Sequence, residues 1–372
     1  MVYSLRADGS ITTESMPEVA WVFRRQRRLW LEAWQRGEAS SEFFYAMPSL
    51  RDRYRVGFVE EEGPRAFLGL WYPAEWLIAR RVGMGFALDL ALRNLPTLNR
   101  AKVLVSTVDT CGLPLALLKR AGLLRSRVIY ISQGLSDRIA VLGAERWLSR
   151  RYRALLLAVD ELLTLSAGAQ AGLAAWLGVP TERVRVLPFG TDCKFWRSTA
   201  PAGAVGAHVV SVGSDPGRDY DTLLAAAGDL PLHIVTRQRL ALDGRVGVVR
   251  TTDHSPRELR DIYSGARFVV IPLHDRSQPS GQSAALQAMA CGRAVVHTKT
   301  RGWWGEPYLR DGENCVLVPP GEPWALGEAL RRLWSDADLC RRLGQRARET
   351  VAEHFAEQRM ATSLDAIIAA HL

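Results

Sequence analysis

Short apolar segments alternate with longer amphipathic segments along most of this chain, and no other feature constrains its fold as strongly. The apolar segments have the length of buried strands, and the amphipathic segments have the length and spacing of helices. Strands that are joined by helices pair in parallel, because the connection must return to the same end of the sheet. The alternation therefore predicts an α/β fold.

The alternation forms two series, which are separated near Gly190 by the stretch TDCKFWRSTAPAGAVG, whose composition is typical of a linker. A chain of 372 residues also exceeds the usual size of a single core. We predict a first domain over residues 1–190, a linker over 191–206, a second domain over 207–352, and a last helix over 353–372 that crosses back to the first domain.

The apolar periods also predict the limits of the elements. In the first series we expect strands at Tyr54–Glu60, Lys102–Thr107, Arg127–Ser132, Glu161–Leu165 and Val184–Leu187, with helices that include Leu113–Ala121 and Ala169–Leu177. In the second series we expect strands at His208–Val212, Leu232–Thr236, Val246–Arg250, Phe268–Pro272, Ala294–Thr298 and Val316–Val318, and helices at Tyr220–Ala227, Pro256–Ser264, Ser283–Ala290, Pro323–Ser335 and Ala337–His354.

Composition narrows the class of protein. The net charge is +9, but only four of the 48 basic residues are lysines, and a preference for arginine on solvated faces explains this as well as a phosphorylated partner does. No nucleic-acid recognition motif accompanies the charge, so we expect no nucleic-acid partner. The five cysteines are widely spaced and form no CxxC pair, which argues against a disulfide framework or a zinc site. Charged residues interrupt the most apolar stretch, Leu77–Leu92, and no signal peptide is visible, so we expect a cytoplasmic protein.

The segment Phe268–Lys299 is the most informative, because a buried strand ends there in a polar loop and a helix opens beside Gly281. The first turn of a helix offers unpaired N–H groups and the positive end of the helix dipole, which suit a pyrophosphate. Gln287 lies one turn after Ser283 on the same helix face, where the ribose of such a ligand would pass. An ordinary strand–loop–helix unit with polar surface glutamines fits the spacing equally well.

This segment resembles the donor site of family 4 retaining glycosyltransferases of the GT-B fold. The likeness extends from about Asp160 to the end, through VDELLTLSAGAQAGLAAWLGVPTERVRVLPFGTD, SVGSDPGRDYDTLLAAA and ACGRAVVHTKTRGWWGEPYLRDGENCVLVPPGE. It is thin before residue 100. The resemblance implies two Rossmann-like domains that face each other across a cleft, with the nucleotide-sugar donor held by the second.

The resemblance also places basic side chains near the diphosphate. Arg218 stands where the family usually has a lysine, and Ser214 replaces the arginine that usually precedes it. Arg237 is available as the next cation, although TRQRL replaces the glycine-rich turn expected there. A solvated surface charge is the alternative for both arginines. The nucleotide base would lie near Thr252 and His254, although a single histidine is more often structural.

The family's pair of glutamates, eight positions apart, falls on Pro279 and Gln287, so both acids are absent. The Gln287 amide is still able to hydrogen-bond a ribose hydroxyl, whereas Pro279 has no equivalent group. The phosphates need only backbone N–H groups, and those implied by the resemblance belong to Ser280, Gly281, Gln282 and Ser283.

The resemblance implies that such transferases need no metal or other cofactor. It also implies that they need no strong general base, because the leaving diphosphate accepts the proton of the acceptor. The protein then has to neutralise that diphosphate and hold both reactants. The sequence Asp219-Tyr-Asp221 does match the DxD of metal-dependent transferases, but it opens a helix, where aspartate is a common cap. We interpret it as a cap and expect no metal.

Further candidates come from outside the donor motif. Asp109 and Gln133 follow buried strands of the first domain, and with Arg218 they are the candidate catalytic residues. A turn or helix cap is the alternative role for Asp109 and Gln133. Trp303 and Trp304 are candidates for the wall of the sugar pocket, with core packing as the alternative.

The segment Trp21–Gly37 combines three tryptophans with five arginines. A basic helix with tryptophan on one face is able to lie on an anionic membrane, which would make the protein peripheral at the inner face. Packing of this segment on the first domain is the alternative.

The resemblance therefore implies a metal-independent retaining glycosyltransferase. It would use a UDP- or GDP-type sugar and an acceptor hydroxyl, with lipid-linked and polysaccharide precursors as acceptor classes. Two alternatives stay open. One is an epimerase or hydrolase of nucleotide sugars with the same fold, and the other is an inactive binding or scaffold protein, which the loss of both motif glutamates favours.

Overall fold

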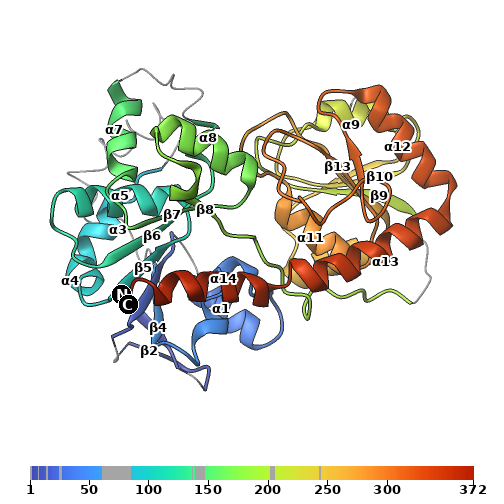
Figure 1. Ribbon diagram of the computed structural model, residues 1–372. Helices are drawn as coiled ribbons and strands as arrows, with labels where there is room; N and C mark the ends of the chain where they lie inside the picture. Colours follow the sequence, from blue (N-terminus) through green and yellow to red (C-terminus); the bar gives the residue numbers. More distant parts are fainter. Residues whose placement is uncertain are drawn as a thin grey trace. The chain divides into compact units, whose positions relative to one another are not determined.

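The computed structural model of the chain describes residues 2–6, 8–13, 16–24, 27–60, 85–135, 137–138, 147–201, 206–242 and 244–372 (Figure 1). Its internal contacts divide the chain into two compact units, each built around its own sheet. Unit 1 comprises residues 1–35, 43–188 and 360–372, and unit 2 comprises residues 36–42 and 189–359.

Unit 2 contains a sheet of six parallel strands within the described residues, in the order β11-β10-β9-β12-β13-β14. Its alternate strand residues are buried against helices, and α9 packs against α12 while α11 packs against α13 (Figure 1). Helix α11 also contacts α10. The strands are β9 (His208–Val212), β10 (Leu232–Val235), β11 (Val248–Thr251), β12 (Ala266–Ile271), β13 (Val295–Thr298) and β14 (Val316–Val318), and the helices are α9 (Tyr220–Ala227), α10 (Pro256–Ser264), α11 (Gln282–Ala290), α12 (Pro323–Ser335) and α13 (Ala337–His354).

Local sequence explains where the helices of unit 2 begin. Asp219 accepts a hydrogen bond from the Thr222 N–H, so its predicted role as a cap is confirmed. Ser255 and Glu258 form a reciprocal capping box at the start of α10. Because such caps satisfy N–H groups that the helix itself leaves open, they fix the first residue of each helix.

Unit 1 contains a sheet of eight strands in the described part of the chain, in the order β2-β1-β4-β3-β5-β6-β7-β8. The strands β1 and β2 at one edge are antiparallel, and the remaining pairs are parallel. The strands are β1 (Val2–Leu5), β2 (Ile11–Thr12), β3 (Val19–Val22), β4 (Val56–Val59), β5 (Val103–Ser106), β6 (Arg127–Ser132), β7 (Glu161–Thr164) and β8 (Val184–Val186), and the helices are α1 (Arg27–Gln35), α3 (Leu88–Arg93), α4 (Leu95–Leu98), α5 (Asp109–Arg120), α7 (Trp147–Leu156) and α8 (Ala167–Leu177), with short 3-10 turns at Glu42–Phe44, Pro48–Leu50 and Thr181–Arg183.

The segment Trp21–Gly37 does not form one amphipathic helix, so that part of the prediction is wrong. Trp21 is fully buried in β3, because this strand lies between β4 and β5 and both of its faces are covered. The helix starts only at Arg27, and its tryptophans Trp30 and Trp34 stack edge-to-face on neighbouring phenylalanine rings. The helices of the described residues include none with the length and apolarity needed to cross a bilayer, and the predicted apolar stretch Leu77–Leu92 lies partly outside those residues.

Residues 36–42 pack within unit 2, although the sequence places them in the first domain. The Ser41 hydroxyl donates a hydrogen bond to Asp192 at 3.0 Å, and the buried Glu42 accepts one from the indole N–H of Trp196 at 2.8 Å. The last helix, α14 (Glu357–Ala369), starts in unit 2 and continues in unit 1, where the Tyr54 hydroxyl donates to Asp365 at 2.7 Å. Part of the predicted linker, residues 202–205, lies outside the described residues.

Candidate functional site

The strand order of unit 2 fixes where a ligand is able to bind. Strands β9 and β12 are neighbours at the centre of the sheet. β10 and β11 lie on the β9 side, and β13 and β14 lie on the β12 side, so the strand order reverses between β9 and β12. Open parallel sheets bind ligands at such a reversal, beyond the carboxyl ends of the strands. The loops after β9 and β12 meet there, because the Asp219 N–H donates to the Pro272 carbonyl at 3.1 Å and the His274 N–H donates to the Gly217 carbonyl at 2.9 Å.

Gly281 ends the loop after β12 and stands directly before α11. Its φ is +71°, in the left-handed region that favours glycine. A methyl group at this position would lie 2.3 Å from Ile271 Cγ2, 3.0 Å from Arg218 Nη1 and 3.3 Å from His297 Nε2. Gly281 therefore brings these side chains against the backbone, and it has no side chain to cap the first turn of α11.

Arg218 is held beside this glycine. Its Nε lies 3.0 Å from Asp215 Oδ2, and the side chain is 4% exposed. Gly213 gives it room, because a methyl group there would stand 2.0 Å from Arg218 Nε. Asp215 also accepts a hydrogen bond from the Ser280 hydroxyl at 2.9 Å. The acid thus orients both the arginine and the loop, while Arg218 Nη1 has no hydrogen-bond partner within the described part of the chain.

His297 completes the cluster from the end of β13. Its Nδ1 lies 2.8 Å from the Thr298 carbonyl, so Nδ1 carries the proton and Nε2 is left as an acceptor. Burial lowers the pKa of His297 to about 3, and the neighbouring Arg218 charge acts in the same direction, so the ring is neutral. Within the described residues its Nε2 has no hydrogen-bond partner.

Trp303 and Trp304 surround the His297 ring, with centroid distances of 5.0 and 5.7 Å. They are 7% and 6% exposed, so most of each ring is packed in the interior. Neither indole N–H has an acceptor among the described residues. Buried polar groups in native proteins are nearly always paired, and an unpaired group needs an explanation. Three donors and one acceptor around Gly281 match a ligand that carries both anionic oxygens and hydroxyl groups.

Ser214 and Arg237 are brought together, because the Arg237 backbone N–H donates to the Ser214 hydroxyl at 2.9 Å. The Arg237 side chain is exposed and pairs with Asp253 at 2.9 Å, which neutralises its charge. His254 lies with Nε2 2.7 Å from the Thr251 hydroxyl, and His233 shares that hydroxyl at 2.8 Å. Thr252 is exposed beside them.

Gln287 is 5% exposed and already has protein partners. Its Nε2 donates to Glu42 Oε1 at 2.9 Å, and its Oε1 lies 3.5 Å from the Tyr263 hydroxyl. A ribose contact would require these bonds to be exchanged. Burial raises the pKa of Glu42, although hydrogen bonds from Gln287 and Trp196 act against the shift. At Gln287 this chain therefore has an amide that meets a carboxyl group supplied from residues 36–42.

Asp109 and Gln133 lie together in unit 1, at the carboxyl ends of β5 and β6. Asp109 accepts hydrogen bonds from the Tyr130 hydroxyl at 2.8 Å and from the Gln133 and Gly134 N–H groups at 3.1 and 2.6 Å. Burial raises the pKa of Asp109, and these bonds oppose the shift. The Gln133 amide donates to the Thr107 carbonyl and to the Tyr45 hydroxyl. These contacts join neighbouring strands, and a catalytic role for either residue stays a prediction.

Sequence reasoning missed Asp215, His297 and Glu42. Asp215 had a signal, because an acid three residues before Arg218 within one turn is placed to pair with it. His297 had a weaker one, since it stands at the carboxyl end of a predicted strand. Glu42 had none, because 245 residues separate it from Gln287.

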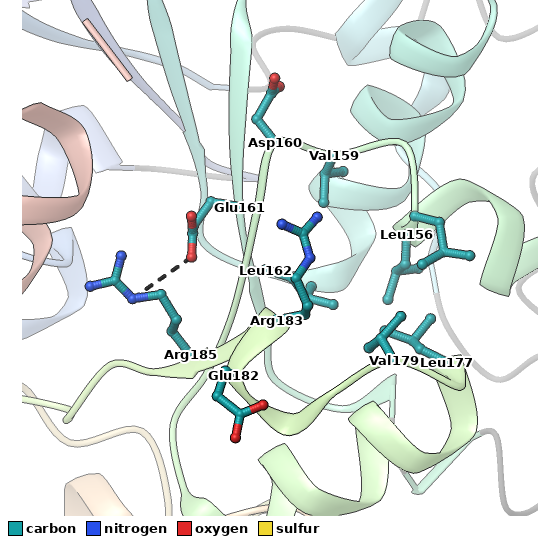
Figure 2. Close-up of a pocket in the computed structure, with 11 residues that line it drawn as sticks. Leu156, Val159, Asp160, Glu161, Leu162, Leu177, Val179, Glu182, Arg183 and Arg185 are labelled. Carbon is teal, nitrogen blue, oxygen red and sulfur yellow. Dashed lines mark ion pairs between the residues drawn. The ribbon is translucent and has the colours of Figure 1, made fainter. Parts of the chain in front are cut away.

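A separate hollow in unit 1 has a volume of about 160 Å³ (Figure 2). Figure 2 shows Leu177 and Val179 on one side of it and the Glu161–Arg185 ion pair, at 3.8 Å, on the other. Glu161 is the first residue of β7, so this hollow lies at the amino ends of the strands. Ligands of parallel sheets bind at the opposite ends, and we therefore assign it no role in the reaction.

Most of unit 2 resembles a known protein family. Residues 207–336 match the family described as Glycosyl transferases group 1. The putative glycosyltransferase EpsD of Bacillus subtilis is 33% identical over 87 residues, which cover 23% of this chain and 22% of that protein. The D-inositol 3-phosphate glycosyltransferase of Streptomyces bingchenggensis is 34% identical over 101 residues, which cover 27% of this chain and 20% of that protein. The chain thus matches about a fifth of the length of these relatives.

Solved structures show the fold over nearly the whole chain. Anabaena HepE in complex with UDP-glucose superimposes with a TM-score of 0.68 at 15% identity, covering 95% of this chain and 100% of that one. Sucrose-phosphate synthase from Thermosynechococcus elongatus gives 0.66 at 17% identity, covering 94% and 98%. The predicted α/β class with two Rossmann-like domains of the GT-B fold is confirmed. Together the comparisons support a GT-B glycosyltransferase.

Proposed function

We propose that the chain is a retaining glycosyltransferase of family 4, which transfers a glycosyl group from a UDP- or GDP-type sugar to an acceptor hydroxyl without a bound metal. The cluster around Gly281 carries this proposal, because Arg218, Trp303 and Trp304 present N–H groups that have no partner in the described residues. Arg218 stands beside Gly281 and the open first turn of α11, which adds the positive end of a helix dipole, and the two tryptophans pack on the neighbouring His297 ring.

The chemistry requires this kind of site. The bond between the anomeric carbon and the diphosphate oxygen breaks, and the same carbon forms a bond to the acceptor oxygen. The acceptor proton passes to the leaving diphosphate. Negative charge grows on that diphosphate as its bond breaks, so donors that are already in place stabilise the transition state. The neutral His297 Nε2 is an acceptor for a sugar hydroxyl, a role that a protonated imidazole is unable to fill.

Metal independence is part of the proposal. Within the described residues, no three side chains of His, Cys, Asp or Glu are grouped in a way that would hold a metal ion. Arg218 and the helix terminus are instead the groups that offer positive charge to the diphosphate. Because Trp21 is buried in β3, we do not extend the proposal to a membrane contact through Trp21–Gly37.

The donor is tested by titration calorimetry with UDP, GDP and ADP and then with their sugars. We expect UDP or GDP to bind, and Arg218→Ala to lower that affinity at least tenfold, since a charge-assisted hydrogen bond contributes about 1.5–3 kcal/mol. Arg331→Ala is the matched control, because this exposed arginine pairs with Glu328 on α12. Failure of every nucleotide to bind the native protein would overturn the proposal.

The reaction is tested by incubating the bound nucleotide sugar with candidate acceptors. A glycosylated acceptor supports the transferase, and retained anomeric configuration in that product supports the retaining mechanism. Free sugar alone would indicate a hydrolase, and an altered nucleotide sugar would indicate an epimerase. Binding without any product would favour the scaffold alternative, to which the lost motif glutamates at Pro279 and Gln287 also point.

A further inference from the structure

Unit 2 also contains a hollow, separate from the one in unit 1, which the proposed reaction does not use. Its volume is about 410 Å³, within the range of small-molecule sites. Its wall includes four arginines, Arg267, Arg293, Arg341 and Arg348, and two cysteines, Cys291 and Cys340. The residues that line it include no aspartate or glutamate.

This hollow is distinct from the cluster around Gly281. Cys291 stands at the carboxyl end of α11, and Arg267 is the second residue of β12, so the hollow lies at the amino ends of the strands. Gly281 stands at the other end of α11, which is nine residues long. At 1.5 Å per residue the two ends of that helix are about 13 Å apart.

The four guanidinium groups differ from one another in their contacts. Arg293 Nη1 donates to the Ala266 carbonyl at 3.2 Å, and Arg267 lies 4.7 Å from the centre of the Trp334 ring. Carbonyl groups and aromatic rings hold a guanidinium in place without cancelling its charge. Arg341 pairs with Asp338. Arg348 is exposed, and the described part of the chain gives it neither an ion pair nor a hydrogen bond.

The other side chains that line the hollow carry no negative charge. Burial raises the pKa of Cys291 to about 12 and that of Cys340 to about 11, so both thiols are neutral. The first turn of α13 also lines the hollow, through Ala337, and brings the positive end of its dipole. The carboxyl end of α11 carries about half a negative charge, which is small compared with the charge of four guanidinium groups.

We propose that this hollow binds a small anion that carries more than one phosphate group. Guanidinium groups bind phosphate oxygens in pairs, and Arg348 is exposed in the wall without an ion pair or hydrogen bond in the described part of the chain. Four guanidinium groups line this one hollow, so a pyrophosphate group is able to meet more of them than a single phosphate is. The size of the hollow fits a small compound of this class.

Inorganic pyrophosphate is the probe, titrated by calorimetry into Arg218→Ala protein at constant ionic strength. This background weakens the site at Gly281, so that the remaining binding reports the hollow. We expect binding that Arg348→Glu weakens at least tenfold and Arg348→Gln weakens less. Arg346→Glu is the matched control, because this 74% exposed arginine lies two residues earlier on α13 outside the hollow wall, and we expect it to change the affinity less than twofold.

Three results would overturn the proposal. The first is that pyrophosphate does not bind the Arg218→Ala protein. The second is that both Arg348 variants bind pyrophosphate with unchanged affinity. The third is that Arg346→Glu weakens binding as much as Arg348→Glu does. The last result would show a general effect of surface charge. None of these results bears on the nucleotide site, because UDP and GDP binding is measured in protein that retains Arg218.

Discussion

Both units contain an open, mainly parallel sheet, but the polar groups at the carboxyl ends of the strands have partners in unit 1 and lack them in part in unit 2. In unit 1, Asp109 accepts hydrogen bonds from Tyr130, Gln133 and Gly134, so the polar groups there satisfy one another. In unit 2, Arg218 Nη1 and His297 Nε2 lie against Gly281 and have no partner in the described residues.

This difference separates polar groups that hold the fold from those that serve a ligand. A buried group with all its partners contributes stability, and its removal costs free energy of unfolding. A buried group without a partner costs stability in the free protein and is retained where function needs it. Removal of Asp109 should therefore lower stability, whereas removal of the partnerless Arg218 guanidinium should act mainly on ligand binding.

Gly281→Ala should have the largest effect, because the new methyl group would stand 2.3 Å from Ile271 Cγ2 and within 3.0 Å of Arg218 Nη1. We expect nucleotide binding to be abolished and the free energy of unfolding to fall by about 3 kcal/mol, from strain at positive φ and overpacking. Calorimetry and urea denaturation measure the two effects. In Gly312→Ala, with φ +73° and no atom within 4 Å, only the strain of about 1 kcal/mol should appear.

Asp109→Ala should lower the free energy of unfolding by about 2–3 kcal/mol, because it leaves a tyrosine hydroxyl and two backbone N–H groups buried without an acceptor. Urea denaturation measures this loss. Asp52→Ala is the control, since Asp52 is 79% exposed and should change stability by less than about 0.5 kcal/mol. A loss of turnover at unchanged stability would instead support catalysis by Asp109 and break the comparison.

Gln287→Glu, which restores the acid of the family pattern, should lower the free energy of unfolding by about 2 kcal/mol at pH 8. It would place a second carboxyl group 2.9 Å from Glu42 Oε1 in a buried position, where two negative charges repel. The double variant Glu42→Gln with Gln287→Glu should recover much of this loss in a double-mutant cycle. If the two changes are additive, Glu42 is not the reason that an amide stands here.

His297→Asn should remove a pH dependence of stability. Because burial lowers the pKa of His297 from 6.5 to about 3, the unfolded chain takes up this proton at a higher pH than the folded chain. The contribution of His297 is therefore complete above pH 6.5 and is lost as the pH falls towards 3. Between pH 7.5 and 5.5 the native protein should lose about 1.4 kcal/mol more than the variant does. Urea denaturation at the two pH values measures these losses. If the native protein and the variant lose the same free energy of unfolding between pH 7.5 and 5.5, the imidazole is not buried and neutral.

The sequence predicted most of unit 2, because each element there has its own local signal. β9, α9 and α13 begin and end at the predicted residues, since aspartate caps and apolar periods define them. The amino-terminal part was harder. β1 and β2 are short edge strands without a clear period, and β3 was hidden because the arginines after Trp21 suggested a helix.

The candidate site was predictable only where it depends on the backbone. Gly281 stands directly before α11, as its place between a loop and an apolar period indicated. His297 and Asp215 depend on tertiary contacts between loops that are distant in sequence, so no local pattern assigned them. Gln287 seemed free for a ribose because its partner Glu42 comes from another part of the chain.

The packing of residues 36–42 in unit 2 has a consequence for protein engineering. A fragment that starts at Phe189 would lack Glu42, and the indole of Trp196 and the amide of Gln287 would lose their shared acceptor. Grafting this half of the molecule onto a related enzyme would therefore have to carry those seven residues along, or replace the three side chains as a set.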